Sequence, residues 1–234
     1  GRAVKPSTVN RDVSNLRAML NKAVEHAKIE VNPIGRIKLL EENNVRERVL
    51  SQDEFESLHL HCPPSLKGIV LIGFYLPMRQ AEILNLTWKE IDLKMGFIRL
   101  GGERTKNKIG RNIPLHPRII KFLRTCPRPI DGGYVFGNSR RFNRKAYNKA
   151  VESAGITDFN FHDLRHCAIN NMRLAGNDHF VIKQASGAKT DSAFERYNLV
   201  TEQEMKSIKW LDEKSVKSGT MDTYMDTSTK TKIA

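Results

Sequence analysis

Residues 161–172 read FHDLRHCAINNM, and this segment lies within a helix predicted at residues 161–175. Its apolar residues recur at the spacing of a helix with one buried face: Phe161, Leu164, Ala168 and Met172. Three polar residues, His162, Arg165 and His166, share another side of that helix and are expected at the margin of the buried face. An arginine beside a histidine suits a phosphate, because the guanidinium binds two oxygens and the imidazole donates or moves a proton. An amphipathic helix with a capping histidine is the structural alternative.

The segment PMRQAEIL at residues 77–84 carries a second candidate arginine. Arg79 follows the apolar run at residues 68–78, which predicts a buried helix. An arginine at the end of such a run is costly unless it meets an anion. Glu82 lies one helical turn further along the chain and can hold the guanidinium in place. A surface Arg–Glu pair is the alternative interpretation.

Two more segments carry candidate residues. The segment RTKNKIGR at residues 104–111 is predicted to form the tip of a hairpin, from which Lys106 can reach a cleft and give up a proton. A solvated turn is the alternative there. Tyr197 stands in the segment FERYN, and a phenol with a pKa of about 10 is a weak nucleophile without help.

The rest of the pattern predicts a mainly α fold with a small antiparallel β-sheet. Ser51 and Glu54 form a capping box that begins one helix. Ser7 or Thr8 is expected to cap an earlier helix, which Asn32-Pro33 is expected to end. The other helices are predicted at residues 7–30, 65–76, 79–86, 117–124, 139–154, 161–175, 178–186, 190–198 and 202–212, and two strands at 97–100 and 111–115.

Composition narrows the class of partner. The net charge of +13 and the pI of about 9.8 favour a partner made of phosphates. No apolar run reaches the length of a membrane span, so no membrane is expected as a partner. Three cysteines without a CxxC pair argue against a disulfide framework or a zinc site and fit a reducing cytoplasm. The polar group at residues 162–166 also lacks the carboxylate and third ligand of a metal site.

Together these segments resemble the tyrosine recombinase (phage integrase) family, over residues 51 to about 212. The family pattern runs Arg, Lys, His-x-x-Arg, His or Trp, and Tyr, and the segments MRQAEIL, TKNKIGRNIPL, HDLRH and RYN match its boxes. The resemblance implies a set of catalytic residues, with Glu82 and His166 in supporting positions: Arg79, Lys106, His162, Arg165 and Tyr197.

Position 188 departs from this pattern. The family normally has a histidine or tryptophan after the glycine of its LGH-like box, and here that position is Ala188. The frame is intact, because Ala188 lies 23 residues after Arg165 and nine before Tyr197. An alanine side chain cannot donate a hydrogen bond to a phosphate oxygen, so we expect the enzyme to be slowed. The alanine is either an introduced or a natural substitution.

The resemblance also implies how the chain is organised. Residues 1–40 look like the C-terminal part of a helical core-binding domain, 41–50 read as a linker, and 51–212 correspond to the catalytic domain. Residues 213–234 are rich in Ser, Thr, Lys and Asp and are expected to form a flexible tail.

The function that the resemblance implies is site-specific DNA recombination without a metal or cofactor. Tyr197 would attack a DNA phosphodiester to give a 3′-phosphotyrosyl intermediate, followed by strand exchange and religation. The implied partners are a double-stranded DNA recombination site and further copies of the chain, as a tetramer on two DNAs held by the C-terminal helix Glu202–Leu211. The implied setting is the cytoplasm, in a bacterial, phage or mobile-element context. A type IB topoisomerase-like enzyme and a non-catalytic DNA-binding module remain the alternatives.

Overall fold

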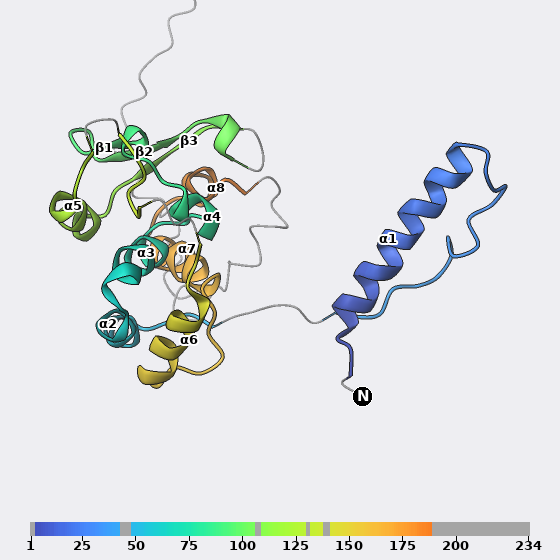
Figure 1. The fold of residues 1–234 in the computed structure, drawn as a ribbon, viewed down its shortest axis with the longest axis horizontal. Coiled ribbons are helices and arrows are strands. Elements are labelled where there is room, and N and C mark those ends of the chain that lie inside the picture. Colours follow the sequence, from blue (N-terminus) through green and yellow to red (C-terminus); the bar gives the residue numbers. More distant parts are fainter. Residues whose placement is uncertain (1–2, 43–47, 106–108, 130–131, 138–140, 189–234) are drawn as a thin grey trace, which may run out of the picture. The chain divides into compact units, whose positions relative to one another are not determined.

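The computed structural model describes residues 3–42, 48–105, 109–129, 132–137 and 141–188. This part of the chain is mainly helical with a small antiparallel sheet, which confirms the predicted fold class (Figure 1). The elements in chain order are α1 (Pro6–Glu25), α2 (Gln52–His61), α3 (Pro64–Tyr75), α4 (Gln80–Leu84), β1 (Ile91–Asp92), β2 (Phe97–Leu100), β3 (Arg111–Pro114), α5 (Pro117–Thr125), α6 (Arg144–Ser153), α7 (Asp163–Leu174) and α8 (His179–Ser186). The helices predicted at 190–198 and 202–212 lie outside the described residues.

Helix α1 and the segment that follows it form a local unit. The predicted span of 7–30 is too long, because the helix ends at Glu25 and Ala27 adopts a left-handed φ of 51°. The N–H of Lys28 donates to the carbonyl of Ala23 at 2.8 Å, which is the bond of a Schellman cap. Neither Ser7 nor Thr8 caps the other end, where the N-cap is Lys5 and Pro6 begins the helix.

The segment after α1 then runs back along the helix, as Figure 1 shows. Asn10 is buried, and its amide Nδ2 donates to the Leu40 carbonyl at 2.8 Å while its Oδ1 accepts from the Leu40 N–H at 2.8 Å. Apolar side chains of this unit stay open to solvent, with Met19 68% and Val31 75% exposed. Its assignment to a core-binding domain stays a prediction.

The sheet has the order β1-β2-β3, with both pairs antiparallel. The predicted hairpin of β2 and β3 is confirmed, and Leu100 lies opposite Arg111 in its register. Strand β1 is absent from the prediction, because its two residues are too few for a period-2 pattern. Along β3, Arg111 and Ile113 point to the buried face, and the residues that alternate with them are exposed.

The core is built around α3, which packs against α7. The two helices approach closely at Gly73, where an added Cβ would lie 3.2 Å from Cδ1 of Leu164. Phe55 of α2 stacks on Phe74 of α3 with ring centroids 3.8 Å apart. The capping box of Ser51 and Glu54 begins α2 as predicted. The core therefore fixes the end of α3, which leads into α4, beside the start of α7.

Several other predicted helix boundaries differ from the structure, and three of them lie near the candidate residues or differ most. The apolar run at 68–78 is helical only to Tyr75, because Leu76 precedes a proline and is extended, with φ −116° and ψ 138°. The helix predicted from 139 begins at Arg144, after Asn143, whose Oδ1 accepts the Ala146 N–H at 3.0 Å. The helix predicted from 161 begins at Asp163.

Candidate active site

Arg79 and Glu82 meet at the start of α4. Arg79 is the N-cap residue, with 28% of its side chain exposed, whereas 6% of the Glu82 side chain is exposed. The Arg79 N–H donates to Oε2 of Glu82 at 2.7 Å, and its Nη1 donates to Oε1 at 3.0 Å. The predicted contact is therefore present, and it differs from a surface pair because the carboxylate is buried.

Arg165 lies on the first turn of α7, one turn after the N-cap residue His162. The sequence predicts this arginine at the margin of the buried face, which is wrong, because the residue is only 4% exposed. Its burial is offset by backbone acceptors: Nη1 donates to the Pro77 carbonyl, and Nη2 donates to the Ser186 carbonyl at 2.9 Å. Because Pro77 precedes Arg79 by two residues, the Arg165–Pro77 hydrogen bond connects α7 to the segment that carries Arg79.

Three successive carbonyl oxygens at the end of α8 each accept a hydrogen bond from a different arginine. The pairs, with their N–O distances, are Arg111 Nε to Ala185 (2.9 Å), Arg165 Nη2 to Ser186 (2.9 Å) and Arg79 Nη2 to Gly187 (3.2 Å). The last carbonyls of a helix lack partners within it and carry partial negative charge. The end of α8 thus gathers three guanidinium groups from three separate segments, which we call the arginine cluster.

Arg111 is the member of the arginine cluster that sequence reasoning missed. Its Nη2 donates to Oε2 of Glu82 at 2.7 Å and its Nη1 to Oε1 at 3.2 Å, so one carboxylate binds two arginines. A signal was present in the sequence, since Arg111 and Ile113 are two residues apart on the predicted strand, and both lie on the buried face of β3.

His162 lies beside the arginine cluster and is exposed. Its backbone N–H donates to Oδ1 of Asn160 at 2.9 Å, and its ring lies 5.6 Å from that of His166, edge to face. Desolvation by the surrounding protein, followed by the positive charge of Arg165, holds the pKa of His162 below its ordinary value. The imidazole is therefore neutral at pH 7 and can accept a proton or a hydrogen bond.

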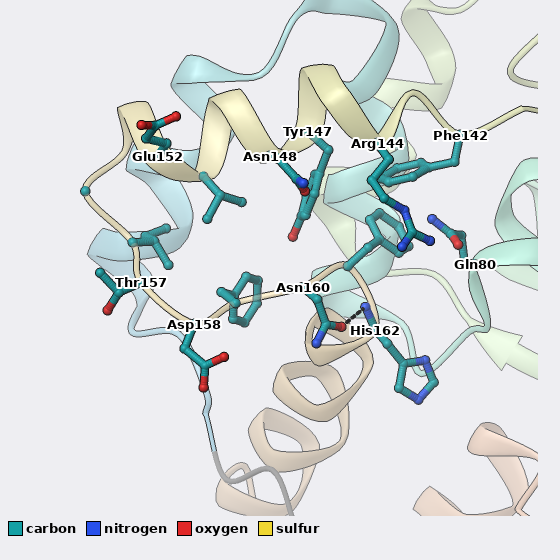
Figure 2. A pocket seen from close by; sticks show the side chains of 15 residues that line it. Gln80, Phe142, Arg144, Tyr147, Asn148, Glu152, Thr157, Asp158, Asn160 and His162 are labelled. Carbon is teal, nitrogen blue, oxygen red and sulfur yellow. Dashed lines mark hydrogen bonds between the residues drawn. The ribbon is translucent and has the colours of Figure 1, made fainter. Parts of the chain in front are cut away.

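A pocket of about 760 Å³ adjoins this histidine (Figure 2). His162 and Gln80 line it, together with Arg144 and Asn148 of α6. In Figure 2 the Arg144 side chain extends from α6 toward the part of the pocket where Gln80 and His162 lie. The pocket therefore lies between Gln80, which follows Arg79, and the exposed residues Arg144 and Asn148 of α6.

Nothing in the described residues gathers three or more His, Cys, Asp or Glu side chains in a way that could hold a metal ion. The described helices also include none with the length and apolar character that a membrane crossing requires. What the described site offers is two guanidinium groups and a neutral imidazole close to one another. That combination can bind a tetrahedral oxyanion and accept a proton beside it.

A model of the phage integrase family matches residues 48–204. The chain belongs to the phage integrase family. This match covers the arginine cluster, His162 and the segment FERYN, and it favours the recombinase interpretation over a type IB topoisomerase.

Proteins similar in sequence include a shufflon-specific DNA recombinase of Escherichia coli, 30% identical over 202 residues, which are 84% of this chain and 52% of the relative. The integrase of Salmonella phage P22 is 27% identical over 214 residues, covering 82% of this chain and 54% of that protein. The chain thus spans about half the length of these two curated relatives.

Solved structures agree on the fold. A lambda integrase dimer bound to a COC′ core site superposes with a TM-score of 0.67 at 19% identity, over 82% of this chain and 73% of that one. The Tn1549 transposon integrase in complex with a circular intermediate DNA gives a TM-score of 0.66 at 16% identity, over 88% and 79%. At these identities the likeness concerns the architecture.

Ala188 follows the end of α8, where the phage integrase pattern has its histidine or tryptophan. Its N–H donates to Oγ of Ser186 at 3.2 Å, and its methyl group packs beside Ile169 and Ile182. Position 188 therefore lies one residue beyond the carbonyl of Gly187 that Arg79 binds.

Two residues of the phage integrase pattern, Lys106 and Tyr197, lie outside the described residues. The hairpin around Lys106 is described up to Thr105, whose Oγ1 donates to the Gly102 carbonyl at 3.1 Å and to the Ile109 carbonyl at 2.9 Å. The catalytic roles of Lys106 and Tyr197 stay proposals.

A second tyrosine, Tyr147, is a poor candidate for the nucleophile. It is 1% exposed and packs against Phe142 and Phe161 in the core. Desolvation, with negative charge nearby, raises the pKa of its phenol well above the ordinary value. A buried phenol with a raised pKa neither reaches a DNA phosphate nor ionises readily.

Proposed function

We propose that this chain is the catalytic part of a site-specific DNA recombinase or integrase that cuts and rejoins DNA through Tyr197. One observation carries the proposal: Arg79 and Arg165 are fastened to the same end of α8, with His162 at the start of the helix that bears Arg165. This is the arrangement that a metal-free phosphoryl transfer requires, because two guanidinium groups can neutralise the charge that gathers on the equatorial oxygens.

The reaction is a transesterification. The Tyr197 hydroxyl oxygen attacks phosphorus, a 3′-phosphotyrosyl bond forms, and the bond from phosphorus to the 5′ oxygen breaks. His162 accepts the tyrosine proton or donates to the phosphate, and Lys106 protonates the departing 5′ oxygen. Attack by the 5′-hydroxyl of another strand reverses these steps. One phosphodiester replaces another, so no nucleotide hydrolysis is required.

The proposed partner is a double-stranded DNA recombination site, and α6 offers a surface for it. Arg144, Lys145, Asn148 and Lys149 are exposed on this helix. Arg144 and Asn148 also line the pocket that His162 and Gln80 share, so this helix and the proposed catalytic histidine border the same cavity (Figure 2). Arginine and lysine side chains in such a row bind the phosphates on either side of a cleavage point.

The finer assembly is also a proposal. We expect a tetramer on two DNAs, held together by the helix predicted at Glu202–Leu211, whose Met205, Ile208 and Leu211 are spaced for one apolar face. That segment lies outside the described residues. Residues 1–40 would belong to a core-binding domain that grips the DNA. Relatives in Escherichia coli and in a Salmonella phage support action on DNA in a bacterial cytoplasm.

A DNA-binding module without catalysis is the competing function, and Ala188 is the observation that favours it. A duplex with a nick close to the cleavage point distinguishes the recombinase from the binding module. After cleavage the short strand diffuses away, so religation cannot occur and the protein stays covalently attached to the DNA. We expect an SDS-resistant protein–DNA adduct. DNA binding without any adduct, on sites that contain the recognised sequence, would favour the binding module.

A further inference from the structure

Arg111 is a buried arginine to which the family pattern quoted above assigns no role. The residue is the first of β3, opposite Leu100, and 5% of its side chain is exposed. An arginine keeps its charge at any ordinary pH, and such a residue is seldom buried without specific partners. The burial of Arg111 therefore depends on the hydrogen-bond partners that the neighbouring site supplies.

The guanidinium of Arg111 binds two elements at once. Its Nη1 and Nη2 form a fork on the Glu82 carboxylate of α4, at 3.2 Å and 2.7 Å. Its Nε points the other way and donates to the Ala185 carbonyl of α8 at 2.9 Å. The side chain is thus a rigid link between the element that carries Arg79 and the element that precedes Ala188.

The end of α8 is shaped for this link. Gly187 has a left-handed φ of 66°, and an added Cβ there would lie 2.9 Å from Nη1 of Arg111. A side chain at 187 would therefore displace the guanidinium. The close approach of glycine and arginine sets the position of the carbonyl that Arg79 binds.

Charge gives the link a second consequence. Each oxygen of Glu82 accepts from both arginines: Oε1 from the Nη1 atoms of Arg79 and Arg111, and Oε2 from the Arg79 N–H and Nη2 of Arg111. One negative charge is shared between two positive ones, so the three side chains carry a net charge of +1. Arg79 consequently keeps positive charge for an incoming phosphate and is not neutralised by its own carboxylate.

We propose that Arg111 is a positioning residue for phosphoryl transfer, which holds Glu82 and the end of α8 so that Arg79 faces the phosphate with its charge intact. The inference rests on the proposed recombinase function. It assigns no contact with DNA to Arg111, which acts through Glu82 and Ala185. Loss of the Arg111 side chain should slow the chemical step and leave DNA affinity unchanged.

The test is the single-turnover rate of adduct formation on the nicked duplex, measured beside DNA affinity and thermal unfolding. Arg111→Met removes every donor, and we expect the rate to fall about 100-fold, the effect of misplacing a reacting group slightly. Arg111→Lys keeps the charge but lacks the planar guanidinium, so it cannot form the two-point contact with Glu82 together with the separate Nε contact to Ala185. We expect it to be intermediate, about 10-fold slower than the parent.

Arg118→Met is the matched control, because Arg118 also forks a carboxylate, that of Glu56, in a pair that is 40% and 44% exposed. It should lower stability without slowing the reaction. A double-mutant cycle with Glu82→Gln adds a second readout. Arg111→Met should slow a chain that already carries Glu82→Gln much less than it slows the parent.

Parent-like rates for folded Arg111→Met or Arg111→Lys would overturn the inference. So would equal fold-losses from Arg111→Met in both backgrounds. If Arg111→Met does not fold, the lysine variant decides alone. A parent chain that forms no adduct contradicts the recombinase proposal, whereas an active parent with a parent-like Arg111 variant contradicts this inference only.

Discussion

The backbone N–H of Ala188 donates a hydrogen bond of 3.2 Å to the hydroxyl oxygen of Ser186. The carbonyl of the same Ser186 accepts from the guanidinium of Arg165 at 2.9 Å, so position 188 is held to the residue that anchors the second arginine. A side chain at 188 with a hydrogen-bond donor would therefore start from a fixed point beside the arginine cluster.

The substitution Ala188→His should raise the single-turnover cleavage rate by about 10²–10³, the usual worth of one preorganised donor at a charged transition state. DNA affinity should not change, since the proposed phosphate contacts of Arg79 and Arg165 are present in both chains. Ala188→Leu, which adds bulk without a donor, is the control and should give no gain. Equal rates for the alanine and histidine chains would show that position 188 takes no part in the reaction.

The pH dependence of cleavage should reflect His162. Desolvation and then Arg165 lower the pKa of this imidazole below 6.5, so the base is neutral and competent at pH 7. As the pH falls, protonation removes the acceptor, and the rate should drop only below pH 6.5. His162→Asn should slow the reaction by about 10²-fold and abolish this acid limb. An acid limb that persists in the asparagine variant would assign it to another group.

Direct contacts of α6 with DNA can be distinguished from the effect of the protein's net charge on DNA binding. Arg144→Ala should weaken binding and reduce the slope of log affinity against log salt by about 1, because one phosphate contact is lost. Arg124→Ala removes another exposed arginine, from the last turn of α5, and should leave the slope unchanged. Equal slopes for the two variants would argue that α6 does not face the DNA.

The C-terminal segment is expected to mediate assembly. Deleting residues 202–234 should reduce complexes that hold several copies of the chain more than it reduces binding of one copy to DNA. Deleting residues 213–234 alone removes only the predicted tail and should leave assembly unchanged. Native gels with labelled DNA distinguish these species, and normal assembly after the longer deletion would contradict the role of the predicted helix.

Short-range features of the molecule follow from the sequence. The capping box of Ser51 and Glu54 and the pairing of Arg79 with Glu82 each span three residues, so local helix geometry is enough to predict them. The same local logic fails at α1, where apolar spacing continues to Ala27 but a left-handed turn at that residue has already ended the helix.

Long-range features do not follow in the same way. Arg111 is 29 residues from Glu82 and 74 from Ala185, and only the folded sheet and helices bring the three together. Arg165 is read as marginal because nothing in its helix supplies an acceptor, whereas the carbonyls of Pro77 and Ser186 come from other segments. Buried charge is therefore the part of this site that the local sequence conceals.

Covalent attachment of DNA to Tyr197 is the step on which the proposed recombinase function depends. The measurement is covalent adduct formation on a nicked recombination-site duplex, followed by mapping of the DNA-linked peptide. We expect an adduct at Tyr197 in the parent chain, none with Tyr197→Phe at unchanged DNA affinity, and an adduct with Tyr147→Phe, whose phenol is buried. An SDS-resistant adduct that persists in a Tyr197→Phe chain would show that Tyr197 is not the nucleophile.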